Sequence, residues 1–134
     1  MSCHRRGCRH GQLLLHLLKR CSTILSFDTI KCLHALSFTI GPIPKQSIFI
    51  HNNILSSYIS LGEVLHSRKM FNCMPHRTIV TYNTLITAYC RLGDVDNAWD
   101  LLSHMSRSGF VPTQYTLTRL LSCEFLNLSL GAQL

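Results

Sequence analysis

The chain has 134 residues, enough for one ordinary domain, and its 46% hydrophobic and 14% charged content excludes an intrinsically disordered protein. Seven Lys/Arg and one acidic residue give residues 1–47 a net charge of +6, whereas six Lys/Arg and five acidic residues give residues 48–134 a net charge of +1. No stretch approaches the ~20 uninterrupted apolar residues of a membrane-spanning helix, so no membrane association is predicted.

The first ten residues form a basic segment, with three arginines ahead of a leucine-rich run. His16 interrupts that run and no small-residue cleavage site follows it, which disfavours a secretory signal. The first acidic residue is Asp28, a pattern that also fits the Arg-rich, acid-poor transit peptide of an organelle. We interpret residues 1–10 as a basic segment that is disordered or part of a targeting signal.

The seven cysteines are odd in number and include no C-x-x-C spacing, which disfavours a disulfide framework or a zinc ribbon. The Cys and His residues near the N-terminus fit no common ligand spacing either, so the sequence predicts no metal site and no cofactor. Cys90 and Cys123 stand among apolar residues at helical spacing, where free cysteines are usually small buried hydrophobes.

Two apolar helices are expected before the middle of the chain, over residues 13–21 and 29–38, followed by a turn at Gly41–Pro44. A first helical hairpin is expected over residues 48–78. It has apolar residues at helical spacing up to Tyr58, a stop at Gly62, and a second apolar stripe that ends at Pro75.

The next segment repeats this pattern at an offset of 31 residues. Seven positions are identical between the two copies: Ile48/Ile79, Asn52/Asn83, Tyr58/Tyr89, Leu61/Leu92, Gly62/Gly93, Val64/Val95 and Met74/Met105. Helix breaks are expected again at Gly93 and at Gly109–Pro112, with Asp94 capping the second helix. One hairpin cannot bury both of its faces, so the repeats predict an all-α fold, an α-solenoid of stacked antiparallel helical hairpins.

A further copy begins at residue 114, matching the preceding one at an offset of 35. We expect the chain to end inside the second helix of this incomplete copy. The loss of that helix would expose an apolar end that favours self-association through the C-terminal repeat. The affected residues are Leu120, Leu121, Phe125 and Leu126.

Residues 80–102, VTYNTLITAYCRLGDVDNAWDLL, resemble the consensus of the pentatricopeptide repeat family closely. Met-Pro-His-Arg at residues 74–77 is similar to the end of that family's short repeats, and residues 31–35 resemble the second helix of its long repeats. The succession resembles the plant subgroup of mixed repeat lengths. It implies a divergent long repeat over residues 11–47, a short one over 48–78, a standard one over 79–113 and an incomplete long one over 114–134.

The resemblance implies sequence-selective binding of single-stranded RNA, with roughly one base per repeat. The base-facing residues would be Asn52, Asn83 and Thr118, with Thr78 and Thr113 as their partners at the repeat ends. Phe49 and Val80 would pack against bases. Thr78 and Thr113 stand where the family usually has Asp or Asn. The resemblance implies that the repeats containing Asn52 and Asn83 prefer a pyrimidine base.

The resemblance also implies a role in organellar RNA processing, editing or stabilisation, in a mitochondrion or chloroplast, with other RNA-processing proteins as further partners. The alternative is a protein-binding scaffold of the tetratricopeptide kind, because hairpins of similar length also build peptide grooves. The W-x2-L-G-x2-Y pattern of that family is absent.

An enzyme is the second alternative, because plant relatives sometimes carry a C-terminal zinc deaminase domain. Its H-x-E and C-x-x-C signatures are absent, as are nucleophile-elbow, P-loop and Rossmann motifs. His34, His66 and His104 are expected at helix surfaces, because nothing in the sequence supplies the partner that acid–base catalysis needs. We therefore expect no enzymatic activity.

Overall fold

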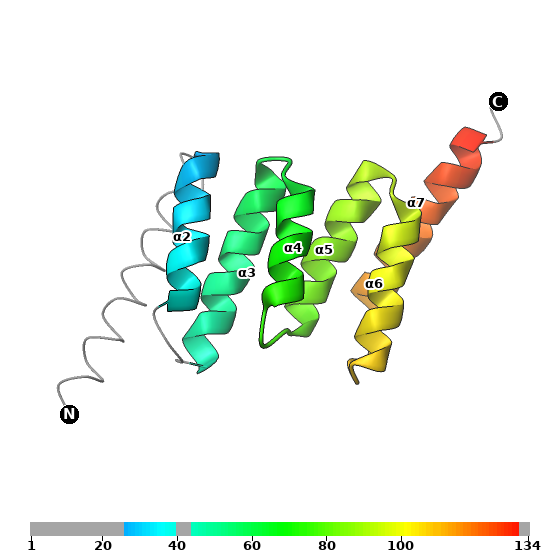
Figure 1. The fold of residues 1–134 in the computed structure, drawn as a ribbon. Coiled ribbons are helices and arrows are strands. Elements are labelled where there is room, and N and C mark those ends of the chain that lie inside the picture. The colour runs from blue at the N-terminus through cyan, green and yellow to red at the C-terminus, as the bar shows by residue number, and fades with distance from the viewer. Residues whose placement is uncertain (1–25, 40–43, 132–134) are drawn as a thin grey trace. The chain divides into compact units, whose positions relative to one another are not determined.

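The computed structural model describes residues 26–39 and 44–131, which form six α-helices and no strand (Figure 1). The chain divides into two compact units, Met1–His76 and Arg77–Leu134, and each is described by itself. Consecutive helices in each unit pack against one another. The expected all-α class, with the helical hairpins of a repeat solenoid, is confirmed.

The first unit contains α2 (Phe27–Thr39), α3 (Pro44–Ser60) and α4 (Val64–Cys73), with α3 packed against both neighbours. The expected helix over residues 29–38 is thus confirmed, while the one over residues 13–21 lies outside the described residues. α3 begins four residues before the expected start, because proline is well tolerated in a first helical turn, where its missing N–H has no helical partner. The largest fully buried side chains here are Ile30, Ile54, Leu55, Tyr58, Met70 and Phe71.

The α3–α4 hairpin turns where the sequence predicted, at Gly62. Its φ of 79° lies in the left-handed region that glycine adopts without a steric penalty. The hydroxyl of Ser67, fully buried on α4, donates a hydrogen bond to the carbonyl of Leu55 on α3 at 3.3 Å. A side chain this small lets the two helices approach closely.

Histidines take part in the interior of the first unit. His34 Nδ1 lies 3.0 Å from the hydroxyl of Tyr58, and the His66 ring stacks on the Tyr58 ring at 5.7 Å between centroids. His51 is buried and stacks against Phe38. The expectation that His34 lies at a helix surface was therefore wrong, because a buried tyrosine hydroxyl needs a polar partner and histidine provides one. The His66 side chain is 40% exposed and its Nδ1 lies 3.1 Å from a Glu63 carboxylate oxygen, as expected for a residue at a helix surface.

This arrangement predicts acid sensitivity. Burial, followed by the neighbouring His66, lowers the pKa of His34 below 6.5, and burial, followed by His34, lowers that of His51. The unfolded chain then binds more protons than the folded one, so stability is complete above pH 6.5 and declines as the pH falls below it. We expect the melting temperature to drop as the pH falls below about 6.5. His34→Gln should flatten that drop, whereas the same change at exposed His76 should leave it unaltered.

The second unit contains α5 (Ile79–Leu92), α6 (Val95–Arg107) and α7 (Gln114–Gly131), which pack against one another pairwise. Gly93 ends α5 in the left-handed conformation with φ 73°, and the Asp94 carboxylate accepts the backbone N–H of Asn97 at 3.2 Å to cap α6. Both sequence predictions are confirmed. The largest fully buried side chains are Tyr82, Leu85, Ile86, Leu101, Met105 and Leu120.

Two expectations for this unit were wrong. The ring of His104 is half-buried against the Tyr82 hydroxyl, with Nδ1 at 2.9 Å, instead of lying at the surface. α7 continues without a break to Gly131, so the second helix expected inside residues 114–134 does not form there. The sequence between Leu117 and Gly131 contains neither glycine nor proline to interrupt it.

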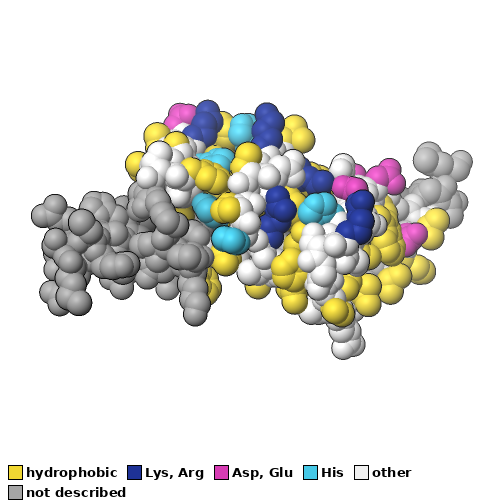
Figure 2. Space-filling view, turned by 60° about the horizontal axis from the view of Figure 1, so that its bottom comes forward, with side chains coloured by type: hydrophobic (Ala, Val, Ile, Leu, Met, Phe, Trp, Pro, Cys, Tyr) yellow, Lys and Arg dark blue, Asp and Glu magenta, His cyan; other side chains and the backbone are white. Residues whose placement is uncertain are grey.

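The exposed apolar end was predicted in part. Leu121, Phe125 and Leu126 are exposed, but Leu120 is fully buried because it lies on the side of α7 that faces the rest of the unit. Figure 2 shows hydrophobic side chains gathered at the α7 end of the described surface. Self-association through this end stays a prediction. Among the described residues, no helix combines the length and the apolar character needed to cross a membrane.

Candidate nucleic-acid interface

A continuous stripe runs along one side of α5, formed by Val80, Asn83, Thr87 and Arg91, which are spaced three or four residues apart. Val80 and Arg91 are exposed, and Asn83 and Thr87 are half-buried. α5 contains no acidic residue. An apolar, an amide, a hydroxyl and a guanidinium group are therefore presented in sequence along one helix.

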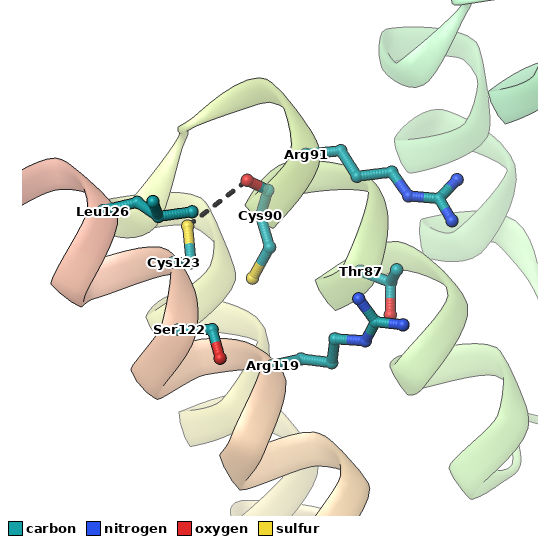
Figure 3. A pocket seen from close by; sticks show the side chains of 7 residues that line it. All are labelled: Thr87, Cys90, Arg91, Arg119, Ser122, Cys123 and Leu126. Atoms are coloured by element: carbon teal, nitrogen blue, oxygen red, sulfur yellow. Dashed lines mark hydrogen bonds between the residues drawn. The ribbon is translucent and has the colours of Figure 1, made fainter.

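α7 runs beside this stripe, and the two helices border an open pocket of about 220 Å³ (Figure 3). The guanidinium groups of Arg91 and Arg119, one from each helix, extend to the same side of the pocket. Neither arginine forms an ion pair with any residue that the structure describes. The side chains lining the pocket are Thr87, Cys90, Arg91, Arg119, Ser122, Cys123 and Leu126.

An aromatic side chain lies beside the arginines of this pocket. Tyr115 lies against it, with its hydroxyl 3.5 Å from the Thr87 hydroxyl and its ring 5.2 Å from the Arg119 guanidinium carbon. Hydrogen bonds from Thr87 and Arg119, followed by the charges of Arg119 and Arg91, lower the pKa of the Tyr115 phenol. Both arginines that lower this pKa line the pocket.

Acidic residues of the second unit lie mostly elsewhere. Three of the four, Asp94, Asp96 and Asp100, cap or belong to α6, and only Glu124 is on α7. The unit has four arginines and no lysine, so its formal charge is zero. The acidic side chains are thus concentrated on α6, while α5 carries one arginine and no acidic residue and α7 carries one of each.

The two cysteines of the pocket have a structural role. Cys123 is buried, and its thiol donates to the carbonyl of Cys90 at 3.3 Å. Burial, followed by the contact with Cys123, raises the pKa of Cys90 to about 12. A thiol with so high a pKa is a poor nucleophile at neutral pH, and the described residues contain no cluster that could hold a metal ion.

The residues predicted to pack against bases are exposed. Phe49 on α3 is 63% exposed and Val80 on α5 is 60% exposed, and Tyr115, at the matching position of α7, is 50% exposed. Each of the three first helices thus presents one large apolar side chain to solvent at the same repeat position. Exposure of these large side chains to water is unfavourable in the isolated chain. It therefore favours a role for them in binding a partner.

The predicted base-facing residues lie one turn further along their helices. Asn52 is half-buried on α3, and Asn83 is half-buried on α5, where its side-chain oxygen accepts a hydrogen bond from the Thr116 hydroxyl at 2.6 Å. Thr118 is exposed on α7, and its hydroxyl donates to the Gln114 carbonyl at 2.7 Å. Tyr58 and Tyr89, which follow Asn52 and Asn83 by six positions in the two copies, are buried in the core.

The two threonines predicted at the repeat ends are helix caps. Thr78 Oγ1 accepts from the Thr81 backbone N–H at 3.4 Å, and Thr81 Oγ1 accepts from the Thr78 N–H at 3.0 Å. Thr113 and Thr116 make the same reciprocal pair ahead of α7, at 3.3 and 3.2 Å. These hydroxyls already accept hydrogen bonds from backbone N–H groups. Their contact with RNA stays a prediction.

Because Thr78 caps α5, its replacement has a measurable cost. We expect Thr78→Ala to lower the free energy of unfolding by about 1 kcal/mol, since an N–H of the first turn loses its acceptor. Thr78→Ser should retain most of the stability. Chemical denaturation followed by circular dichroism measures both. If the alanine variant is as stable as the parent, the cap contributes nothing in solution.

Sequence reasoning missed the residues that complete this surface. Arg91 and Arg119 come from helices that are far apart in sequence, so only packing brings them to one pocket. Thr116 stands at the position of Thr81 in the preceding repeat, at the offset of 35 residues. The recurrence of Thr three residues after Thr78 and Thr113 was the available signal for the caps.

Comparisons with known proteins agree with this geometry. A model described as the PPR repeat family matches residues 77–123, and one described as PPR repeat matches residues 49–79. The chain is 42% identical over 125 residues to a pentatricopeptide repeat-containing protein of Arabidopsis thaliana, covering 93% of this chain and 17% of that protein. A putative pentatricopeptide repeat-containing protein of the same plant is 36% identical over 109 residues, with 81% and 15% covered.

A third Arabidopsis thaliana relative, also named a pentatricopeptide repeat-containing protein, is 30% identical over 125 residues. The chain spans less than a fifth of the length of these relatives, at 17%, 15% and 15%. The two family matches together extend from residue 49 to residue 123, over α3 to α7. From the repeated hairpins, the family matches and the relatives, it follows that this chain belongs to the pentatricopeptide repeat family.

Proposed function

We propose that the chain binds single-stranded RNA, without catalysing a reaction, through the first helices of its hairpins. The observation that carries this proposal is the α5–α7 pocket, where Arg91 and Arg119 have no acidic partner among the described residues. Phosphates of an RNA backbone supply the missing negative charge. Exposed Val80 and Tyr115 beside them offer apolar and aromatic surface for unpaired bases.

A peptide-binding scaffold is the competing function. Peptide grooves bind mainly through side-chain pockets and main-chain hydrogen bonds. Here the exposed polar groups of α5 and α7 include an amide, hydroxyls and guanidinium groups, which suit base edges and phosphates. Single-stranded RNA is therefore the better match to the chemistry of this surface.

Fluorescence anisotropy with short labelled oligonucleotides tests the proposal. We expect the chain to bind single-stranded RNA, to bind the same sequence less well as a duplex, and to lose affinity steeply as salt rises from about 50 to 200 mM. An arginine-free acidic peptide of matched charge serves as the competitor for the scaffold function. Equal binding of that peptide, or no binding of RNA at low salt, would refute the proposal.

We further propose sequence selectivity, with pyrimidines at Asn52 and Asn83, and a role in organellar RNA processing, editing or stabilisation. The family resemblance and the Arg-rich, acid-poor start of the sequence support a mitochondrial or chloroplast location. That start lies outside the described residues. A fluorescent fusion of the chain, imaged in plant cells with organelle markers, tests the location.

A further inference from the structure

A chain of hydrogen bonds links the cap of α7 to the base-facing residue of α5. The backbone N–H of Thr113 donates to Thr116 Oγ1 at 3.2 Å, and Thr116 Oγ1 lies 2.6 Å from Asn83 Oδ1. Thr116 is only 1% exposed, so water does not compete for its hydroxyl. Residues at the start of one helix therefore act on a side chain of the neighbouring one.

Thr116 Oγ1 has three polar neighbours, since the hydroxyl of Thr113 also lies 3.0 Å from it and can donate to it. A peptide N–H can only donate, so the Thr116 oxygen accepts at that contact, and its own hydrogen points to Asn83 Oδ1, which can only accept. The carboxamide of Asn83 is thereby held with its oxygen toward Thr116 and its NH2 group away from it. That NH2 group donates to no residue in the described part of the chain.

We propose that Thr116 is a positioning residue that sets the base preference at Asn83 by presenting only amide N–H donors to the nucleotide; this rests on the proposed RNA-binding function. A site with donors alone favours a base edge rich in acceptors. Uracil and cytosine each carry two acceptors on the Watson–Crick edge, whereas adenine and guanine each carry one. The oriented amide therefore selects pyrimidines, and the selection originates in the cap of the following helix.

The test compares binding of single-stranded oligouridine and oligoadenosine by the full chain. We expect Thr116→Val to reduce the pyrimidine preference about five- to tenfold, the range that one lost hydrogen bond produces, and Asn83→Ala to reduce it equally. The double variant should show no further loss, since both changes remove the same oriented group. Thr116→Ser keeps the hydroxyl and should retain the preference.

A second variant leaves the Thr113–Thr116 cap of α7 unchanged. Asn83→Asp keeps an acceptor for the Thr116 hydroxyl but has no N–H donor, so it should lose the pyrimidine preference while melting like the parent. In the parent, the side-chain NH2 signals of Asn83 in a 15N-correlated NMR spectrum should show a restricted amide, and Thr116→Val should release it. These two measurements remain decisive if Thr116→Val is unstable.

The outcomes are distinguishable. If RNA is bound but Thr116→Val or Asn83→Asp keeps the full pyrimidine preference, the positioning role is wrong and the RNA-binding function stands. Additive losses in the double variant also contradict it. If the parent binds no RNA, the proposed function fails, and the positioning role fails with it whatever the NMR spectrum shows.

Discussion

Tyr82→Ala is expected to lower the free energy of unfolding of the chain by about 3–5 kcal/mol, the range for removal of a large aromatic side chain from a packed core. Tyr82 is 1% exposed, and its ring lies 5.6 Å from that of Phe110. Its hydroxyl also contacts His104 at 2.9 Å and Ser108 at 3.1 Å. The substitution therefore leaves a cavity and removes the hydroxyl that joins α5 to the end of α6.

Two variants separate the contributions of the ring and the hydroxyl. Tyr82→Phe keeps the ring and should cost about 1 kcal/mol, because it removes only the hydrogen bonds. Tyr115→Ala changes the same residue type at a site that is 50% exposed and should cost much less than Tyr82→Ala. Urea denaturation measures all three. A Tyr82→Ala variant as stable as Tyr115→Ala would show that the second unit does not pack in solution around this side chain.

Helix positions could be predicted from the sequence wherever local chemistry determines them. Gly62 and Gly93 recur at the offset of the repeat, and both adopt the left-handed conformation that ends a helix. Asp94 precedes an apolar stripe and caps it. Tyr58 and Tyr89 recur within apolar stripes and are buried. In each case, the residue itself or its spacing carries the information.

Partnerships between distant residues could not be predicted in the same way. The imidazoles of His34 and His104 bind tyrosine hydroxyls 24 and 22 residues away in sequence. Nothing local to either histidine specifies that partner. The uninterrupted α7 was missed for another reason, because the family pattern implied a second helix where no residue of this sequence breaks the first.

The candidate interface likewise contains residues that local sequence predicts and residues that only tertiary packing brings together. The family resemblance predicted Phe49, Val80 and Asn83 as RNA-facing residues, and they lie at exposed or half-buried helix positions. Thr78 and Thr113 were expected to face RNA, but their hydroxyls are used as caps, a role that their position directly before an apolar helix also permits. The pocket, with one arginine from each helix, depends on how α5 and α7 pack.

Replacing both Arg91 and Arg119 with alanine is expected to have the largest effect on RNA binding. Each arginine that neutralises one phosphate of a single strand contributes about 0.7 to the slope of log affinity against log salt. The double variant should therefore bind with a slope shallower by about 1.4, and its affinity near 50 mM salt should fall by roughly tenfold or more. Both side chains are exposed, so the melting temperature should change little.

Arg107→Ala is the matched control. Arg107 is an exposed arginine of the same unit, but it lies on α6, where its Nε donates to the Ser103 carbonyl at 3.3 Å, away from the stripe on α5. We expect it to leave the salt slope unchanged, while Arg91→Ala alone makes the slope shallower by about 0.7. If Arg107→Ala weakens binding as much as Arg91→Ala does, RNA is attracted by overall charge and the pocket is not its binding site. If neither arginine of the pocket alters the slope, phosphates do not contact this surface, because a phosphate contact cannot be lost without releasing fewer counterions.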